Sequence, residues 1–390
     1  MEFMKELFYR DAYLKEFDAE VIFCDRTEEA YEIILSDTAF YPEGGGQPGD
    51  HGTLNGIEVI DTRTRKGEIV HLTREPIELG TQVHGVIDWQ RRWDHMQQHC
   101  GEHILSGTIH RNFGYENVGF HMGDDVVTID FDGPLTWEQL QDMETKANEV
   151  VMNNVEVEIS YPDEETLKHL EYRSKKELTG VVRIVTIPGA DVCACCGTHP
   201  ARTGEVGLIK VLSLAAHKSG VRIEMISGLR ALKAVQKITD QNLEVSHLLS
   251  ARLYETGDAV KRLQEELLET RKQRNELALR MMETRLDSIR ENEELVIDFE
   301  TAVDTRTLRE FANTVVETKH AGTCAALSID EDAVHYVMIS KTVDLRSLAK
   351  EMNTGLNGRG GGSPEMIQGM FHAEKEEIES VLNKLIKKEA

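Results

Sequence analysis

The stretch Asp191–His199, DVCACCGTH, constrains this chain more than any other, because it packs three cysteines and a histidine into seven residues. A second cluster far upstream, His99–His103, reads HCGEH. Thiolates and imidazoles in sets of four are the usual ligands of tetrahedral zinc. The two clusters therefore predict one metal site built from two distant segments. Cys195 lies four residues before His199, and the sequence at this point leaves open which of Cys193, Cys195 and Cys196 is the sulfur ligand.

Length and composition indicate a multidomain protein. A chain of 390 residues, 40% of them hydrophobic, is expected to form about two to four domains with ordinary cores. No run of eighteen apolar residues is present, and the charged N-terminus lacks the apolar core of a signal peptide. Three of the six cysteines are too crowded for a disulfide framework. These features predict a cytoplasmic protein without a membrane span, whose thiols bind metal.

The charge is unevenly distributed. The net charge of −25 argues against nucleic acid as a partner, but residues 165–237 hold twelve Lys or Arg and only six acidic residues. Such a strip suits a phosphate backbone, although an ordinary solvated surface gives the same composition. The basic residues expected to contact phosphates here are Arg183, Arg202, Lys210, Lys218 and Arg222.

Residues 1–88 consist of short runs typical of strands, such as Ala19–Cys24 and Tyr31–Leu35, and predict a small β-barrel, with a sandwich as the alternative. Between these strands lies Thr38–Asp50, TAFYPEGGGQPGD. Its three consecutive glycines, Gly44–Gly46, let the backbone approach a ligand or another backbone closely. A mobile loop is the alternative interpretation.

Residues 89–230 predict an α+β domain that contains the metal site. A helix expected over residues 90–113 carries His99 and His103, which share one face because they are four residues apart. The order HCGEH differs from the HExxH motif of metalloproteases, in which the glutamate after the first histidine is the general base. The glutamate here lies next to the second histidine, so the sequence does not indicate a metalloprotease.

The remaining chain predicts two further parts. Residues 231–292 almost lack Gly and Pro, and apolar spacing from Val260 to Met281 indicates a coiled-coil seam. We expect an antiparallel helical hairpin that acts as a spacer, a dimer contact, or both. Residues 293–390 predict an α/β module with the glycine-rich loop Gly358–Pro364. Arg359 would place a guanidinium among exposed amides, as in a phosphate cradle, unless the glycines serve only a tight turn.

These motifs closely resemble those of one family. The His99–His103 pair followed by the Cys195–His199 motif resembles the editing domain of alanyl-tRNA synthetases. The Thr38–Gln47 stretch is similar to the glycine motif of the same family, and Gly358–Pro364 resembles the C-terminal domain shared with DHH phosphoesterases. Over nearly its whole length the chain resembles a free-standing alanyl-tRNA editing protein of the long AlaX type.

The resemblance implies a zinc-dependent hydrolase that removes serine from mischarged tRNA(Ala), and it leaves open whether glycine is removed too. It implies one zinc ion per chain, tRNA as the partner, and a homodimer formed through the C-terminal region, where Arg359 would contact tRNA. The implied zinc ligands are His99, His103, Cys195 and His199. The implied catalytic residues are Thr38, Gly45 and Gln47, and the implied pocket-lining residues are Gly44 and Gly46. Cys196 departs from the family pattern, which has glycine at this position.

The physical logic agrees with this resemblance. A synthetase pocket built for alanine cannot strongly reject serine, which adds only a hydroxyl, whereas a second site can require that hydroxyl. Zinc could supply the nucleophilic water or only hold the aminoacyl group. Four protein ligands would fill a tetrahedron, so the first role requires a loose ligand or a fifth position.

Two alternative functions come from other classes. A non-catalytic tRNA-binding protein would use the same four ligands for a purely structural zinc. A phosphoesterase would require an Asp-His-His metal centre, and the nearest string here is Asp94–Met96, DHM. The second alternative is therefore weak.

We predict that Thr38→Val spares metal binding but reduces selectivity for serine over alanine, because valine removes the hydroxyl that would pair with serine. Deacylation of Ser-tRNA and Ala-tRNA measures this ratio. An unchanged ratio would rule out that role for Thr38.

Overall fold

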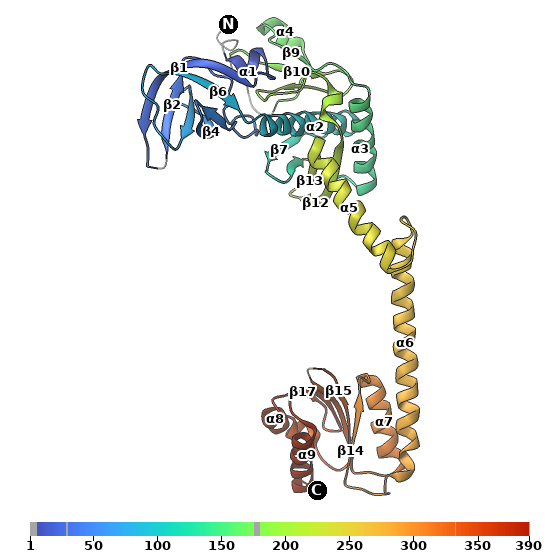
Figure 1. The fold of residues 1–390 in the computed structure, drawn as a ribbon. Helices are drawn as coiled ribbons and strands as arrows, with labels where there is room; N and C mark the ends of the chain where they lie inside the picture. The colour runs from blue at the N-terminus through green and yellow to red at the C-terminus, as the bar shows by residue number, and fades with distance from the viewer. Residues whose placement is uncertain (1–5, 29, 175–179, 332, 390) are drawn as a thin grey trace. The chain divides into compact units, whose positions relative to one another are not determined.

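The computed structural model describes residues 6–28, 30–174, 180–331 and 333–389, and the chain divides into two compact units, residues 1–241 and 242–390 (Figure 1). Lys175 and Lys176, which belong to the predicted basic strip, lie outside the described residues. Among the helices that are described, none is both long and apolar enough to cross a membrane.

The first unit begins with helix α1 (Leu7–Arg10) and a closed six-stranded barrel, which confirms the predicted barrel. The barrel order is β1-β2-β5-β4-β3-β6. Its strands are β1 (Glu16–Arg26), β2 (Tyr31–Leu35), β3 (Gly52–Leu54), β4 (Ile57–Arg65), β5 (Glu68–Thr73) and β6 (Gln82–Ile87). Alternate residues of β1, such as Phe17 and Val21, point into the core, as the period of two requires.

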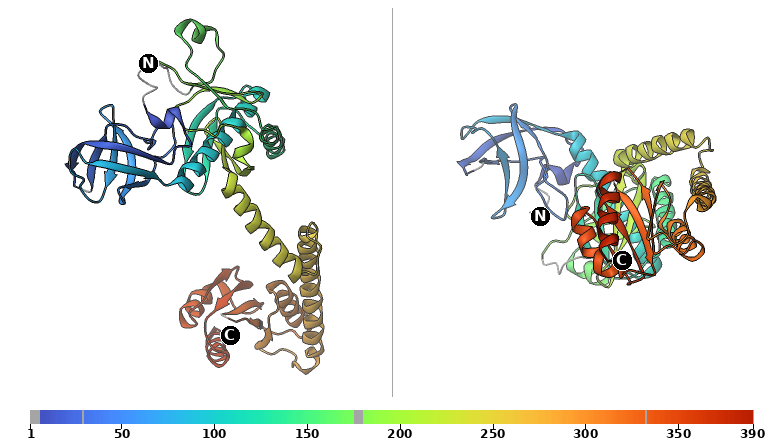
Figure 2. Two further views of the ribbon diagram at one scale, coloured as in Figure 1. Left: turned by 45° about the horizontal axis from the view of Figure 1, so that its top comes forward. Right: turned by 90° about the horizontal axis from the view of Figure 1, so that it is seen from below.

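Helix α2 (Trp89–Phe113) follows the barrel directly and carries the two upstream histidines. It begins at Asp88, whose carboxylate accepts a hydrogen bond from the Arg91 amide, and ends at Gly114 with φ of 72°. Every residue from His95 to Ile109 is buried, because strands of two sheets and a neighbouring helix pack against this helix (Figure 2). A helix enclosed in this way holds its side chains in fixed positions.

The rest of the first unit packs around α2. A four-stranded sheet has the order β12-β13-β8-β7, and a three-stranded sheet has the order β11-β10-β9. Their strands are β7 (Asn117–Met122), β8 (Val127–Phe131), β9 (Glu158–Ser160), β10 (Ile184–Ile187), β11 (Asp191–Ala194), β12 (Ile209–His217) and β13 (Gly220–Ser227). The helices are α3 (Trp137–Met152), with a capping box between Thr136 and Gln139, α4 (Glu164–His169) and the 3₁₀ turn Thr203–Val206.

The second unit is built on a five-stranded mixed sheet of order β14-β15-β16-β18-β17. The strands are β14 (Leu295–Thr301), β15 (Thr323–Ile329), β16 (Val334–Ser340), β17 (Arg359–Gly362) and β18 (Met366–Phe371). The helices are α7 (Thr305–Thr318), α8 (Leu345–Gly355) and α9 (Lys375–Glu389), with the 3₁₀ turn Leu286–Ser288. Hydrophobic cores on the two faces of this sheet confirm the α/β character expected for the module.

Two helices occupy the region of the expected hairpin, α5 (Gly228–Leu248) and α6 (Thr256–Thr284). The boundary between the two units falls inside α5, and the antiparallel packing of the pair stays a prediction. Within α6, the apolar seam residues Leu263, Leu267 and Leu277 are 52%, 49% and 59% exposed. The seam is therefore open along most of the helix.

The glycine-rich run near the C-terminus differs from the expected loop. Residues Arg359–Gly362 form the edge strand β17, paired antiparallel with β18. A Cβ on Gly360 would come 2.3 Å from the Tyr336 hydroxyl oxygen and 2.8 Å from the Gly369 Cα. Glycine is needed at position 360 because the strand crosses a buried tyrosine there at close range.

A buried ion pair connects the barrel to α2. Arg92 and Asp50 have side chains that are 0% and 1% exposed, and the Arg92 Nε lies 3.0 and 2.9 Å from the two Asp50 oxygens. The guanidinium also donates to the carbonyls of Ala12 and Ala39, and Asp50 accepts from the Tyr41 amide at 2.6 Å. The pair thereby fixes both ends of the glycine loop against the start of α2.

Removing one partner of this pair should strongly destabilise the first unit. Arg92→Met leaves the Asp50 charge buried without its partner, and we expect the free energy of unfolding to fall by about 3–5 kcal/mol. Asp50→Asn should act in the same direction. The measurement is urea denaturation.

The control is Arg74→Met, which removes an ion pair with Glu58. The side chains of Arg74 and Glu58 are 72% and 65% exposed, so this substitution should lower the free energy of unfolding by at most about 1 kcal/mol. If Arg92→Met and Arg74→Met lower the free energy of unfolding equally, the buried Arg92–Asp50 pair does not have the stabilising role proposed here.

Candidate metal centre

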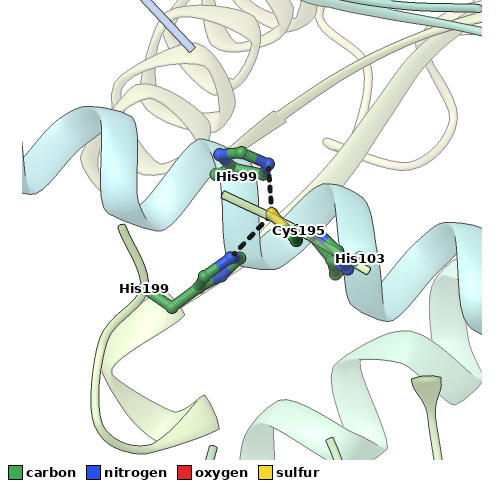
Figure 3. Close-up of side chains that lie close together, drawn as sticks. All are labelled: His99, His103, Cys195 and His199. Carbon is green, nitrogen blue, oxygen red and sulfur yellow. Dashed lines mark hydrogen bonds between the residues drawn. The ribbon is translucent and has the colours of Figure 1, made fainter. Parts of the chain in front are cut away.

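The structure brings the four predicted metal ligands together. One ligand atom from each of His99, His103, Cys195 and His199 lies within 4.8 Å of all the others, and all four residues are buried. His99 and His103 project from one face of α2, while Cys195 and His199 come from the irregular segment after β11 (Figure 3). The helical spacing places one pair, and the packing of β11 beside α2 places the other.

The arrangement fits a tetrahedral zinc ion. The Cys195 sulfur lies 3.4 Å from His99 Nε2 and 3.3 Å from His199 Nε2. Ligand bonds of about 2.0–2.3 Å in a tetrahedron place neighbouring ligand atoms roughly 3.3–3.8 Å apart. Imidazole nitrogen and thiolate sulfur are both usual ligands of zinc. The residues present therefore match the metal that the resemblance implies.

The electrostatics of the cluster favour the ligand form of the cysteine. Burial opposes ionisation of Cys195, but the imidazoles of His99 and His103 outweigh it and hold the Cys195 pKa well below its usual range. Burial lowers the pKa of His199 to about 3, which keeps that ring neutral. A thiolate and a neutral imidazole are the protonation states that a metal requires.

Gln47 reaches the cluster from the barrel. Its side chain is fully buried, and its Oε1 accepts hydrogen bonds from His99 Nδ1 at 3.0 Å and from the Thr198 amide at 3.1 Å. Its Nε2 donates to the Thr198 hydroxyl at 2.9 Å. The contacts of Gln47 therefore hold the ring of His99, a predicted metal ligand, in place. Both the oxygen and the nitrogen of the Gln47 amide are used in these contacts.

The glycine loop makes a tight turn that delivers Gln47. The amides and carbonyls of Gly44 and Gln47 bond each other at 3.0 Å, and Gly45 and Gly46 have φ of 58° and 84°. A Cβ on Gly46 would lie 2.4 Å from the Phe120 ring, which itself lies against His99. The glycines thus permit both the turn and its close approach to the metal ligands.

Thr38 is buried inside the barrel, 5% exposed. Because His71 Nδ1 donates to the Ile33 carbonyl at 3.1 Å, its Nε2 accepts the Thr38 hydroxyl at 2.8 Å. The same hydroxyl oxygen accepts from the Phe40 amide at 3.1 Å. One lone pair of this oxygen is not used by these two bonds. Thr38→Ser, which keeps these bonds, is the matched control for Thr38→Val.

The basic residues that the sequence predicted as phosphate contacts lie in different environments. Contrary to the surface position expected of a phosphate contact, Arg183 is only 7% exposed, and its guanidinium donates to the Cys195 carbonyl at 2.8 Å. Arg222 is exposed but paired with Asp130, and Lys210 is paired with Glu144. Arg202 and Lys218 are exposed. In the second unit, Arg359 lines a cavity of about 420 Å³ that includes His335 and Gln368.

Sequence reasoning missed Arg173 and gave no role to Asp191. The Asp191 carboxylate accepts from His103 Nδ1 at 2.8 Å and from Arg173 Nε at 2.8 Å. The carboxylate of Asp191 has its pKa lowered to about 2; burial opposes this shift, and the hydrogen bonds from His103 and Arg173 outweigh it. The only sequence signal was the position of Asp191 next to the cysteine cluster.

Known proteins match this chain along most of its length. The family described as "Threonyl and Alanyl tRNA synthetase second additional domain" matches residues 182–224. "tRNA synthetases class II (A)" matches residues 12–91, and "DHHA1 domain" matches residues 292–389. The three matches follow the chain order of barrel, metal-binding domain and C-terminal module.

Whole-chain relatives agree with these domain matches. The alanyl-tRNA editing protein AlaX-L of Pyrococcus horikoshii is 31% identical over 96% of this chain and 96% of its own length. Aarsd1 of Mus musculus, also named an alanyl-tRNA editing protein, is 32% identical over 67% of this chain and 68% of its own. The alanine–tRNA ligase of Ignicoccus hospitalis is 34% identical over 69% of this chain but only 31% of its own.

The fold, the His₃Cys cluster and these relatives define a class of proteins related to the editing domains of tRNA synthetases. Within it, the chain belongs to the family of alanyl-tRNA editing proteins, of the long AlaX type.

Changing the sulfur ligand should remove the metal, whereas changing its neighbour should not. Cys195 faces the three histidines, and Cys196 is exposed. We expect Cys195→Ala to reduce bound zinc well below one ion per chain, because it removes the thiolate from the set of four ligands. Cys196→Ala, the matched control, should retain the full content. Metal analysis of the purified proteins measures this, and zinc loss in Cys196→Ala alone would reverse the assignment.

Proposed function

We propose that the protein is a zinc-dependent hydrolase that edits mischarged tRNA(Ala), removing serine and, as a second substrate, glycine. The observation that carries this proposal is the buried His₃Cys cluster joined to the glycine loop through Gln47. Its relatives named as alanyl-tRNA editing proteins support the substrate class.

Zinc bound to His99, His103, Cys195 and His199 would supply a Lewis acid beside the aminoacyl ester. The chain's own residues would do the rest. The Gly44–Gly46 turn, Gly45 included, would line the pocket and let the aminoacyl end approach the cluster closely. Thr38 would accept a hydrogen bond from the serine hydroxyl, which alanine lacks. Gln47 would act by holding His99 in position.

The tRNA would be held by basic residues outside the metal site. Arg202 and Lys218 are exposed in the first unit, and Arg222 is exposed with a carboxylate partner. In the second unit, the guanidinium of Arg359 lies beside a cavity and provides a positive charge that suits phosphate. The open apolar seam of α6 and the C-terminal module would provide the contacts of a homodimer.

A deacylation assay tests the proposal. We expect the purified protein to release serine from Ser-tRNA(Ala) and glycine from Gly-tRNA(Ala), with Ala-tRNA(Ala) largely spared. A zinc chelator should reduce the rate at least tenfold, and added zinc should restore it. The Cys195→Ala variant is the matched inactive control, and Cys196→Ala the active one.

The non-catalytic alternative makes a different prediction. A protein with a structural zinc would bind tRNA without releasing an amino acid, so all three charged tRNAs would decay at the spontaneous rate. That result, with zinc bound in full, would overturn the proposed activity.

A further inference from the structure

The three histidines of the cluster are held unequally, although each presents a ring nitrogen to it. His99 donates its Nδ1 proton to Gln47, and His103 donates its Nδ1 proton to Asp191. His199 is 3% exposed, and its Nδ1 is buried with no hydrogen-bond partner among the described residues. A metal-bound histidine almost always has such a partner, because the partner fixes the ring.

The anchor of His103 is the stronger of the two. Arg173 donates to both oxygens of Asp191, from Nε at 2.8 Å and from Nη2 at 2.7 Å, and the two residues are 9% and 5% exposed. Two backbone hydrogen bonds join Arg173 to β11 and keep the Arg173–Asp191 pair beside the helix. The Arg173 amide donates to the Val192 carbonyl, and the Arg173 carbonyl accepts from the Ala194 amide. The guanidinium thus fixes the carboxylate, and the carboxylate fixes His103.

The backbone shows the same inequality. His99 and His103 stand on consecutive turns of a buried helix, whereas His199 lies in an irregular segment that continues into Pro200. Rotation of the His199 ring breaks no hydrogen bond at Nδ1, and at Nε2 it loses only the contact with the Cys195 sulfur, which a bound metal would replace. Rotation of the His99 ring breaks its hydrogen bond to Gln47, which makes two further bonds to Thr198. Rotation of the His103 ring breaks its hydrogen bond to Asp191, which accepts two further bonds from Arg173.

From these contacts we infer that His199 is the exchangeable metal ligand, and that Gln47 and the Arg173–Asp191 pair are positioning residues for the two permanent histidines. The inference rests on the proposed zinc function and deepens it. It answers how a site with four protein ligands provides a position for an outside ligand, because release of His199 leaves His99, His103 and Cys195 in place.

Metal affinity of the full-length protein tests this unequal anchoring. Cobalt(II) replaces zinc as a coloured probe, and competition with a chromophoric chelator gives its dissociation constant. We expect His199→Ala to weaken cobalt binding by at most about tenfold, and His99→Ala and His103→Ala to weaken it at least a thousandfold. Asp191→Asn and Gln47→Ala should each weaken it about 10–100-fold, as loss of a ligand's hydrogen-bond partner does elsewhere. Equal losses in the three histidine variants would overturn the inference.

Two controls separate anchoring from general damage. Asp130→Asn removes a carboxylate that pairs with Arg222 away from the cluster, and it should leave cobalt affinity unchanged. Arg173→Lys keeps a positive charge beside the Asp191 carboxylate, and it should recover part of the cobalt affinity that Arg173→Met loses. If Asp130→Asn lowers affinity as much as Asp191→Asn, or Arg173→Lys recovers nothing, the positioning role is wrong.

The visible spectrum provides an independent readout. Added imidazole should restore the wild-type cobalt spectrum in His199→Ala, and no change on saturation with imidazole would contradict an exchangeable position. A wild-type protein that binds neither zinc nor cobalt would overturn the metal site and the proposed function together. A wild-type protein that binds both while His199→Ala loses them would overturn only this inference.

Discussion

The buried contact between Arg92 and Asp50 is the constraint on which the candidate site depends. Arg92 lies one helical turn into α2, two turns before His99, and Asp50 closes the loop that begins at Thr38. A buried charge pair of this kind tolerates little displacement, because each partner would be left unpaired at high cost. Barrel, glycine loop and metal-binding helix are thereby held in one register, so that Gln47 meets His99.

The site itself forms where two segments of different character meet. The helix provides rigidity, since His99 and His103 are fixed by a buried α2. The segment after β11 provides Cys195 and His199 and is held by side chains from elsewhere, including Gln47 on Thr198 and Arg183 on the Cys195 carbonyl. Arg183, which charge alone suggested for phosphate binding, illustrates that a basic residue near a site can serve the backbone instead.

Sequence patterns that depend on local spacing predicted the structure well. The alternation in residues 1–88 predicted the barrel, and the histidines four residues apart placed two ligands on one helix face. The glycine-rich run at Arg359 was less well predicted, because three glycines are compatible with both a loop and an edge strand. The strand results from pairing with Met366–Phe371 and from the approach to Tyr336, neither of which local sequence contains.

The sequence by itself determined which residues could bind zinc, because ligand chemistry and helical period are properties of the residues and their spacing. Only the tertiary structure decided what holds those ligands. Gln47 and His99 are 52 positions apart, and His103 and Asp191 are 88 apart. No periodicity connects such positions, so the anchors of His99 and His103, and the lack of a described anchor for His199, follow only from the placement of the glycine loop and β11 beside one helix.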